Sequence, residues 1–153
     1  MTKKGLYFED LLTDKTYTTH RRTITEADHV NFTTSFGFFE PLFMDRAYVE
    51  TETHYGKAIV PGALTFSVAE GLAILTGILH GTGMAFLGVE MKILNPVFIG
   101  DTVSVEIEVV DKRETKKPDR GIVTFFHRVK NQDDTVVIEY TVKRMLRRKP
   151  IGE

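Results

Sequence analysis

The sequence contains no cysteine among its 153 residues. It therefore has no disulfide, no thiolate nucleophile and no cysteine-based metal site, which favours a reducing compartment, and we expect the cytoplasm. An excess of charge is missing too, because 20 Lys and Arg residues are balanced by 21 Asp and Glu residues. The formal net charge of −1 favours neither nucleic acid nor an anionic membrane as a partner.

Long hydrophobic runs are scarce as well. The segment Met1–Asp10 lacks the apolar core of a signal peptide. The most apolar segment, Ala63–Leu79, is interrupted by polar residues and a glycine, namely Thr65, Ser67, Glu70, Thr76 and Gly77. We therefore expect no secretion and no membrane span, and we interpret this segment as a buried helix.

Basic residues gather in two places. The run Lys143–Lys149 contains five cations, and a second group lies between Lys112 and Arg120. The first is interpreted as a solvated strand end and tail rather than a polyanion site. The second is a candidate for contacting phosphates, with a solvated hairpin tip as the commoner meaning of such a pattern.

The first third of the chain predicts one strand and two short helices. Lys15–Ile24 alternates and carries Thr and Tyr, which is typical of a strand. Thr25–Asp28 has the pattern of a capping box, which predicts a helix to about Ser35. Gly37 and Pro41 break that helix, so Gly37–Phe43 is predicted to be a shaped loop. Asp45 can then cap a second helix that ends at Glu52.

The remainder predicts a long helix followed by strands. The segment Ala63–Gly81 is apolar almost all the way round, which indicates a helix enclosed by other structure and stopped by Gly81. Turn signals then separate four strand-like runs: Met84–Leu94, Thr102–Glu114, Gly121–Lys130 and Thr135–Leu146. We predict one α+β domain over residues 1–153, with a long central helix wrapped by a curved antiparallel β-sheet.

Two segments resemble a known family. Gly37–Asp45, read with Val60–Ser67, is similar to the MaoC-like, (R)-specific enoyl-CoA hydratase family, whose fold is the hot-dog fold. The resemblance extends from about Thr23 to Arg144 and includes the turn Leu94–Asp101. It implies an acyl-CoA or acyl-carrier thioester as substrate, no further cofactor, and a homodimer or higher homo-oligomer. The family motif reads Gly-Asp-x-Asn-Pro-aliphatic-His, and its Asp and His perform the hydration.

Alignment on Gly37 and Pro41 leaves that acid-base pair absent. Phe38 takes the place of the catalytic Asp and Phe43 that of the His, while Glu40 takes the place of the Asn. Glu40 is the only ionisable residue between Gly37 and Phe43, so it is the candidate catalytic carboxylate, with an exposed loop residue as the alternative.

The other site candidates follow from the start of the long helix. The Gly62 amide is the candidate oxyanion donor, because first-turn amides are unpaired and lie at the positive end of the helix dipole. Pro61 and Ala63, together with Phe38 and Phe43, are candidate substrate-binding residues, whereas Phe36 and Phe39 are predicted to be core.

No histidine clearly replaces the missing one. His29 and His54 lie nearest to the loop in sequence and are the plausible replacements, each with a surface residue as the alternative. His127 is interpreted as a strand residue among exposed charges. No ligand cluster with metal-binding spacing occurs, so no metal site is predicted.

Three functions fit these patterns. The first is a hydratase or dehydratase that acts on a 2-enoyl or 3-hydroxyacyl thioester, which needs a base, an acid and enolate-stabilising donors. The second, motivated by Phe38 and Phe43, is a catalytically degenerate acyl-CoA binding protein or the inactive partner of another subunit. The third is a hot-dog thioesterase in which Glu40 or Asp45 activates water against the carbonyl.

Overall fold

The sheet is antiparallel throughout in the computed structural model, which describes residues 4–150. Its strand order is β1-β4-β5-β6-β3, and β2 also pairs with β4. The strands are β1 (Thr16–Thr18), β2 (Arg22–Thr23), β3 (Gly83–Ile93), β4 (Thr102–Glu114), β5 (Arg120–Lys130) and β6 (Val136–Arg147). The four predicted C-terminal strands are confirmed within two residues at each end.

The predicted first strand is two short strands instead of one. Between them the Thr19 hydroxyl accepts a hydrogen bond from the Val105 amide at 2.9 Å, and the Thr19 amide donates to the Val105 carbonyl at 3.0 Å. A side-chain oxygen thus replaces a backbone carbonyl in the ladder, and the strand is interrupted there.

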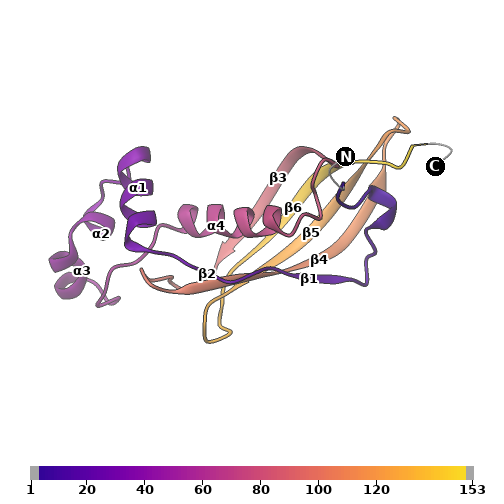
Figure 1. The fold of residues 1–153 in the computed structure, drawn as a ribbon. Coiled ribbons are helices and arrows are strands. Elements are labelled where there is room, and N and C mark those ends of the chain that lie inside the picture. Colours follow the sequence, from indigo (N-terminus) through magenta and orange to yellow (C-terminus); the bar gives the residue numbers. More distant parts are fainter. Residues whose placement is uncertain (1–3, 151–153) are drawn as a thin grey trace.

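Three helices follow β2. The predicted capping box is confirmed at α1 (Glu26–Phe36), where the Thr25 hydroxyl accepts from the Asp28 amide, and Gly37 at φ 74° ends the helix. Asp45 caps α3 (Arg46–Glu52) as predicted. The predicted loop is shorter than expected, because Pro41 begins a helical turn, α2 (Pro41–Met44). These helices lie beyond one end of the sheet (Figure 1).

The long helix α4 (Gly62–Leu75) lies across one face of the sheet (Figure 1). It ends earlier than the predicted stop at Gly81. The Thr76 hydroxyl donates to the Ala73 carbonyl at 2.6 Å, and Gly77 takes a left-handed φ of 78°, so the chain turns there.

The core lies between α4 and the sheet. Buried residues of α4 pack against inward-facing side chains of β4, β5 and β6; they include Leu64, Val68, Ala69, Leu72, Val105, Ile107, Phe125, Val142 and Leu146. A 3-10 turn, η1 (Phe8–Asp10), adds Phe8 at the far end. No helix in residues 4–150 combines the length and apolarity that crossing a membrane requires.

The prediction that Phe36 and Phe39 belong to the core is wrong. Their side chains are 69% and 63% exposed. Both lie at the end of α1 and just after it, in the group of helices beyond the sheet, where the sheet offers no apolar face to cover them.

Candidate functional site

A cavity of about 480 Å³ lies at the N-terminus of α4, and we call it the α4 cavity. Its wall is mostly apolar and includes Ile93 at the end of β3 and the following segment 94–98. The site residues on it are Phe43, His54, Tyr55, Gly62, Thr65 and Asn95. Apolar walls with a few polar groups are typical of pockets for small molecules.

Pro61 and Gly62 bring the start of α4 to this wall. Pro61 is buried and forms the N-cap with φ −53°, so the helix begins at Gly62. A Cβ at Gly62 would lie 2.3 Å from Cδ1 of Ile93, so glycine allows the helix to approach the end of β3. Within residues 4–150 the amides of Gly62 and Ala63 have no acceptor. Gly62 lines the cavity, whereas the exposed Ala63 and the buried Pro61 are not among the lining residues.

Thr65 adds a second donor that the sequence-based prediction missed. Its side chain is only 1% exposed and lines the cavity, yet its hydroxyl has no hydrogen-bond partner within residues 4–150. A buried hydroxyl without a partner costs about 1–3 kcal/mol, so such groups are few in native structures. A hydroxyl residue three positions after a helix-initiating Pro61-Gly62 pair is the signal that points to it.

His54 and Tyr55 form another part of the wall. They follow α3 in a turn fixed by Thr53, whose hydroxyl donates to the Val49 carbonyl at 2.6 Å and accepts from the Tyr55 amide at 3.3 Å. The two rings lie 4.0 Å apart between centroids. Of the two histidines predicted as replacements, His54 is the one whose side chain lines the α4 cavity.

His29 holds the aromatic loop instead. It is 5% exposed, and its Nε2 donates to the Phe43 carbonyl at 2.8 Å, while its Nδ1 has no hydrogen-bond partner in the described chain. Phe43 reaches the cavity wall, and Phe38 packs behind it, with ring centroids 6.1 Å apart. Phe38 also contacts Phe32 at 5.2 Å. Of these two candidate binding residues, the structure brings only Phe43 to the cavity.

Glu40 lies outside the cavity wall. Its side chain is exposed, and it is the N-cap residue of α2 without making a side-chain capping bond. The arrangement therefore brings together Gly62 and Phe43 from the predicted set and adds His54 and Thr65. It leaves Glu40 facing solvent, so its catalytic role stays a prediction. No group of three or more metal-ligating side chains occurs in residues 4–150.

The cavity can perform part of an acyl-thioester reaction. The Gly62 amide and the Thr65 hydroxyl are unpaired donors able to stabilise negative charge on a carbonyl oxygen. The imidazole of His54 is able to accept or donate a proton. The apolar wall around Phe43 is suited to an acyl chain.

A buried polar network lies under α4, separate from the cavity, and corrects the interpretation of His127. His127 is 1% exposed, and its Nδ1 donates to the Tyr140 hydroxyl at 2.6 Å; this hydroxyl donates to Glu70 at 2.7 Å, and Arg144 pairs with the other Glu70 oxygen. Burial, helped by the positive charge of Arg144, lowers the pKa of His127 to about 3. Burial and Glu70 raise the pKa of Tyr140. His127 is thus a neutral core residue.

Comparison with known proteins places the chain in a family. The model of the MaoC-like domain matches residues 8–131. The (R)-specific enoyl-CoA hydratase of Aeromonas caviae is 36% identical over 100 residues, which are 65% of this chain and 69% of that protein. Protein MaoC of Klebsiella aerogenes is 35% identical over 116 residues, which are 75% of this chain. The matched region spans only 33% of Protein MaoC.

Solved structures confirm the predicted fold. A structure described as the monoamine oxidase regulatory protein of Archaeoglobus fulgius is 31% identical to this chain and superposes with a TM-score of 0.89. The match covers 98% of this chain and 99% of that chain. Rv0216 of Mycobacterium tuberculosis, described as a double hot-dog fold, has a TM-score of 0.80 at 20% identity, over 97% of this chain and 46% of that one. The second likeness is evidence of fold alone, and the fold is the hot-dog fold.

Proposed function

Because the chain belongs to the MaoC-like domain family, we propose that it binds a 2-enoyl or 3-hydroxyacyl thioester in the α4 cavity and acts on it as a hydratase or dehydratase. The observation that carries the proposal is the buried hydroxyl of Thr65, a residue of the cavity wall, which has no partner in the described chain and lies on the same wall as the free amide of Gly62. Two unpaired donors at one apolar wall match the needs of a thioester carbonyl.

Hydration in this cavity needs three events. The thioester carbonyl accepts hydrogen bonds from the Gly62 amide and the Thr65 hydroxyl, so that negative charge on its oxygen is stabilised as the enolate forms. A base takes a proton from water while the water oxygen bonds to the β carbon, and a proton is then delivered to the α carbon. We assign the proton transfers to His54. Dehydration runs through the same steps in reverse.

Crotonyl-CoA hydration, followed by loss of absorbance, tests the assignment. His54→Asn is expected to lower kcat by about a hundredfold, as for the loss of a general acid-base group, with little change in KM. Glu40→Gln serves as the parallel variant for the carboxylate predicted from the sequence. Unchanged turnover in either variant removes that residue from the mechanism, and release of free coenzyme A would indicate a thioesterase.

A second candidate function is binding without turnover. Phe38 and Phe43 pack against each other at 6.1 Å, and neither can transfer a proton. Calorimetry that detects crotonyl-CoA or 3-hydroxybutyryl-CoA binding, together with no product in either direction, would favour this function. The acyl-carrier form of the thioester is tested in the same way with an acylated phosphopantetheine as probe.

We further propose that the chain forms a homodimer through β3. This strand is at the edge of the sheet and exposes a row of large apolar side chains: Phe86, Leu87, Val89, Met91 and Ile93. An open apolar edge is a template for pairing with a second copy. Sedimentation is expected to give a dimer, and Val89→Lys to give a monomer; a monomeric native chain would refute the proposal. The cytoplasmic location stays a prediction that rests on the lack of cysteine.

A further inference from the structure

A second cavity, of about 380 Å³, lies where the two described ends of the chain meet, and we call it the terminal cavity. Its walls are Lys4, Tyr7, Pro118, Asp119, Pro150 and the run Arg147–Lys149. Figure 1 places both ends of the chain at the end of the sheet remote from α1, α2 and α3. The 14 residues of α4 lie between the two cavities and span roughly 21 Å, so the terminal cavity is separate from the α4 cavity.

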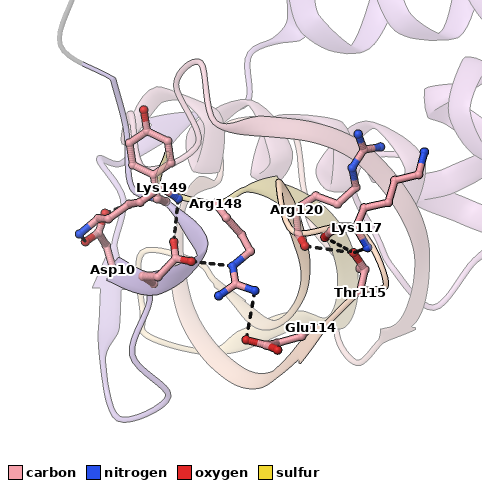
Figure 2. A network of polar contacts seen from close by, with 9 residues as sticks. Asp10, Glu114, Thr115, Lys117, Arg120, Arg148 and Lys149 are labelled. Atoms are coloured by element: carbon pink, nitrogen blue, oxygen red, sulfur yellow. Dashed lines mark hydrogen bonds and ion pairs between the residues drawn. The ribbon is translucent and has the colours of Figure 1, made fainter. Parts of the chain in front are cut away.

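Carboxylates outside the cavity fix part of its basic wall. Nε of Arg148 lies 2.7 Å from Glu9 and Nη1 lies 3.1 Å from Glu114; Figure 2 shows Arg148 joined to Glu114 and Lys149 lying near Asp10. The Lys149 ammonium pairs with Asp10 at 2.5 Å. Nη2 of Arg148 keeps no acceptor within residues 4–150. This guanidinium is therefore held in place with one nitrogen still available.

The only acidic side chain on the cavity wall, Asp119, is already paired within the hairpin beside the cavity. Both oxygens of Asp119 are taken by Arg120, at 2.8 and 2.7 Å. The Thr115 hydroxyl donates to the carbonyl oxygens of Lys117 and Arg120, which fixes the hairpin tip (Figure 2). Asp119 also accepts the Arg148 amide through its backbone carbonyl at 2.9 Å, and this bond ties the tip to the end of β6.

Two cations on the wall remain uncompensated. Lys4 and Arg147 form no ion pair with a carboxylate of residues 4–150, and Arg147 is exposed. Four cations therefore line the cavity with a single carboxylate, and that carboxylate is already paired. An ammonium, a free guanidinium and the free nitrogen of Arg148 are the donors that a phosphate group attracts.

The remaining walls are flat and apolar. The Tyr7 ring is half-buried, and the Lys4 ammonium lies 6.0 Å from the ring centroid. Pro118 and Pro150 form the rest of this surface. Inorganic phosphate would fill only a fraction of 380 Å³, whereas pockets from about 300 Å³ upward hold whole small molecules. A planar heterocycle stacks on such an aromatic face with a gain of about 1–3 kcal/mol.

We propose that the terminal cavity binds a nucleoside phosphate, with its phosphate on Lys4, Arg147 and Arg148 and its base on Tyr7. The site shares no lining residue with the α4 cavity and goes beyond the proposed function. The same chemistry is available from a free nucleotide or from the nucleotide end of coenzyme A.

Calorimetry with adenosine monophosphate, adenosine and inorganic phosphate, each at low and at 150 mM salt, tests this site. Adenosine monophosphate is expected to bind more tightly than either of the other two. Arg147→Gln is expected to weaken it about tenfold, the value of one charge-assisted hydrogen bond. Tyr7→Leu is expected to weaken the nucleotide and leave inorganic phosphate unchanged.

The matched control is Lys143→Gln, which removes one positive charge from an exposed position of the same strand outside the cavity. Equal weakening by Lys143→Gln and Arg147→Gln would overturn the site in favour of general charge attraction. Absence of binding, or phosphate binding as tight as the nucleotide, would overturn the proposal as well. Tighter binding of coenzyme A than of adenosine monophosphate identifies coenzyme A as the source of the nucleotide, and weaker binding identifies a free nucleotide; both outcomes retain the site.

Discussion

Nε2 of His29 in α1 donates a hydrogen bond to the carbonyl oxygen of Phe43 in α2 at 2.8 Å. This bond joins two helices that lie beyond the sheet and so have no strand to align them. Phe43 is also a wall of the α4 cavity. His29 therefore acts on the site through position, by holding Phe43, which alignment on Gly37 and Pro41 sets at the histidine of the family motif.

His29→Leu is expected to lower the free energy of unfolding by about 1–2 kcal/mol, because the Phe43 carbonyl loses its donor. Thioester binding should weaken as well, since Phe43 is no longer held at the wall. Denaturant unfolding and calorimetry measure the two effects. Asn31→Ala, an exposed change on the same helix, should alter neither. Full stability in His29→Leu would show that the bond contributes nothing.

Thr65→Val is expected to separate stability from binding. It removes a buried hydroxyl that has no partner in the described chain, so the melting temperature should rise, by the equivalent of about 1 kcal/mol. The same change deletes a donor to the thioester and should weaken substrate binding about tenfold. A fall in stability would mean that the hydroxyl has a structural partner.

Two glycines of α4 offer a matched pair. Gly62→Ala places a methyl group 2.3 Å from Cδ1 of Ile93 and must displace that side chain, so thioester binding is expected to weaken. Gly71→Ala meets nothing within 4 Å and should stabilise the helix by about 0.5–1 kcal/mol with binding unchanged. Equal binding by both variants would argue against a close approach of substrate to Gly62.

Restoring the acid-base pair of the resembling family tests what Phe38 and Phe43 have replaced. Phe43→His puts an imidazole on the cavity wall, and Phe38→Asp adds a carboxylate behind it. The double variant is expected to raise crotonyl-CoA turnover by about a hundredfold, the usual contribution of a positioned acid-base group. It should also melt earlier, because Phe38 packs between Phe32 and Phe43. A double variant that folds but shows no gain in crotonyl-CoA turnover would contradict the assignment of the α4 cavity as the thioester site.

The lowered pKa of His127 predicts that the folded chain loses stability as the pH falls. Its pKa is lowered from 6.5 to about 3 in the folded chain, so the unfolded chain binds the proton more readily. Its contribution to stability is complete above pH 6.5 and is lost as the pH falls from there toward 3. Melting temperatures between pH 7 and 4 should fall less steeply in His127→Gln than in the native chain. His20→Gln, at an exposed position, should leave the slope unchanged.

Local sequence signals predicted most of the fold. The capping box of α1, the Asp45 cap of α3 and the turn residues act within a few positions, so the ends of α1 and α3 and the four long strands were correct. The burial of His127 also had a signal, because it shares the strand face of Phe125 and Val129, both buried. The exposure of Phe36 depends on where the sheet stops, and no local pattern carries that information. The early end of α4 did have a local signal, because Thr76 and the left-handed Gly77 turn the chain there.

The candidate site was predictable only in part. Gly62 and Phe43 were found because they lie in motifs, whereas Thr65 was overlooked since its lack of a partner is a property of the packed structure. Glu40 was favoured because it was the one carboxylate in the loop, but the direction of its side chain follows from its position as the first residue before α2.

The pairing of β1 and β2 with β4 also sets the order in which the chain can fold. Thr16 faces Glu108, and Arg22 faces Val103, so the N-terminal strands have no partner until β4 has been synthesised. Closing such long loops is slow, and the apolar face of α4 is exposed to solvent during that interval. This aggregation-prone interval continues beyond the synthesis of β4, because β4 also pairs with β5, β3 pairs with β6, and α4 packs against buried side chains of β5 and β6.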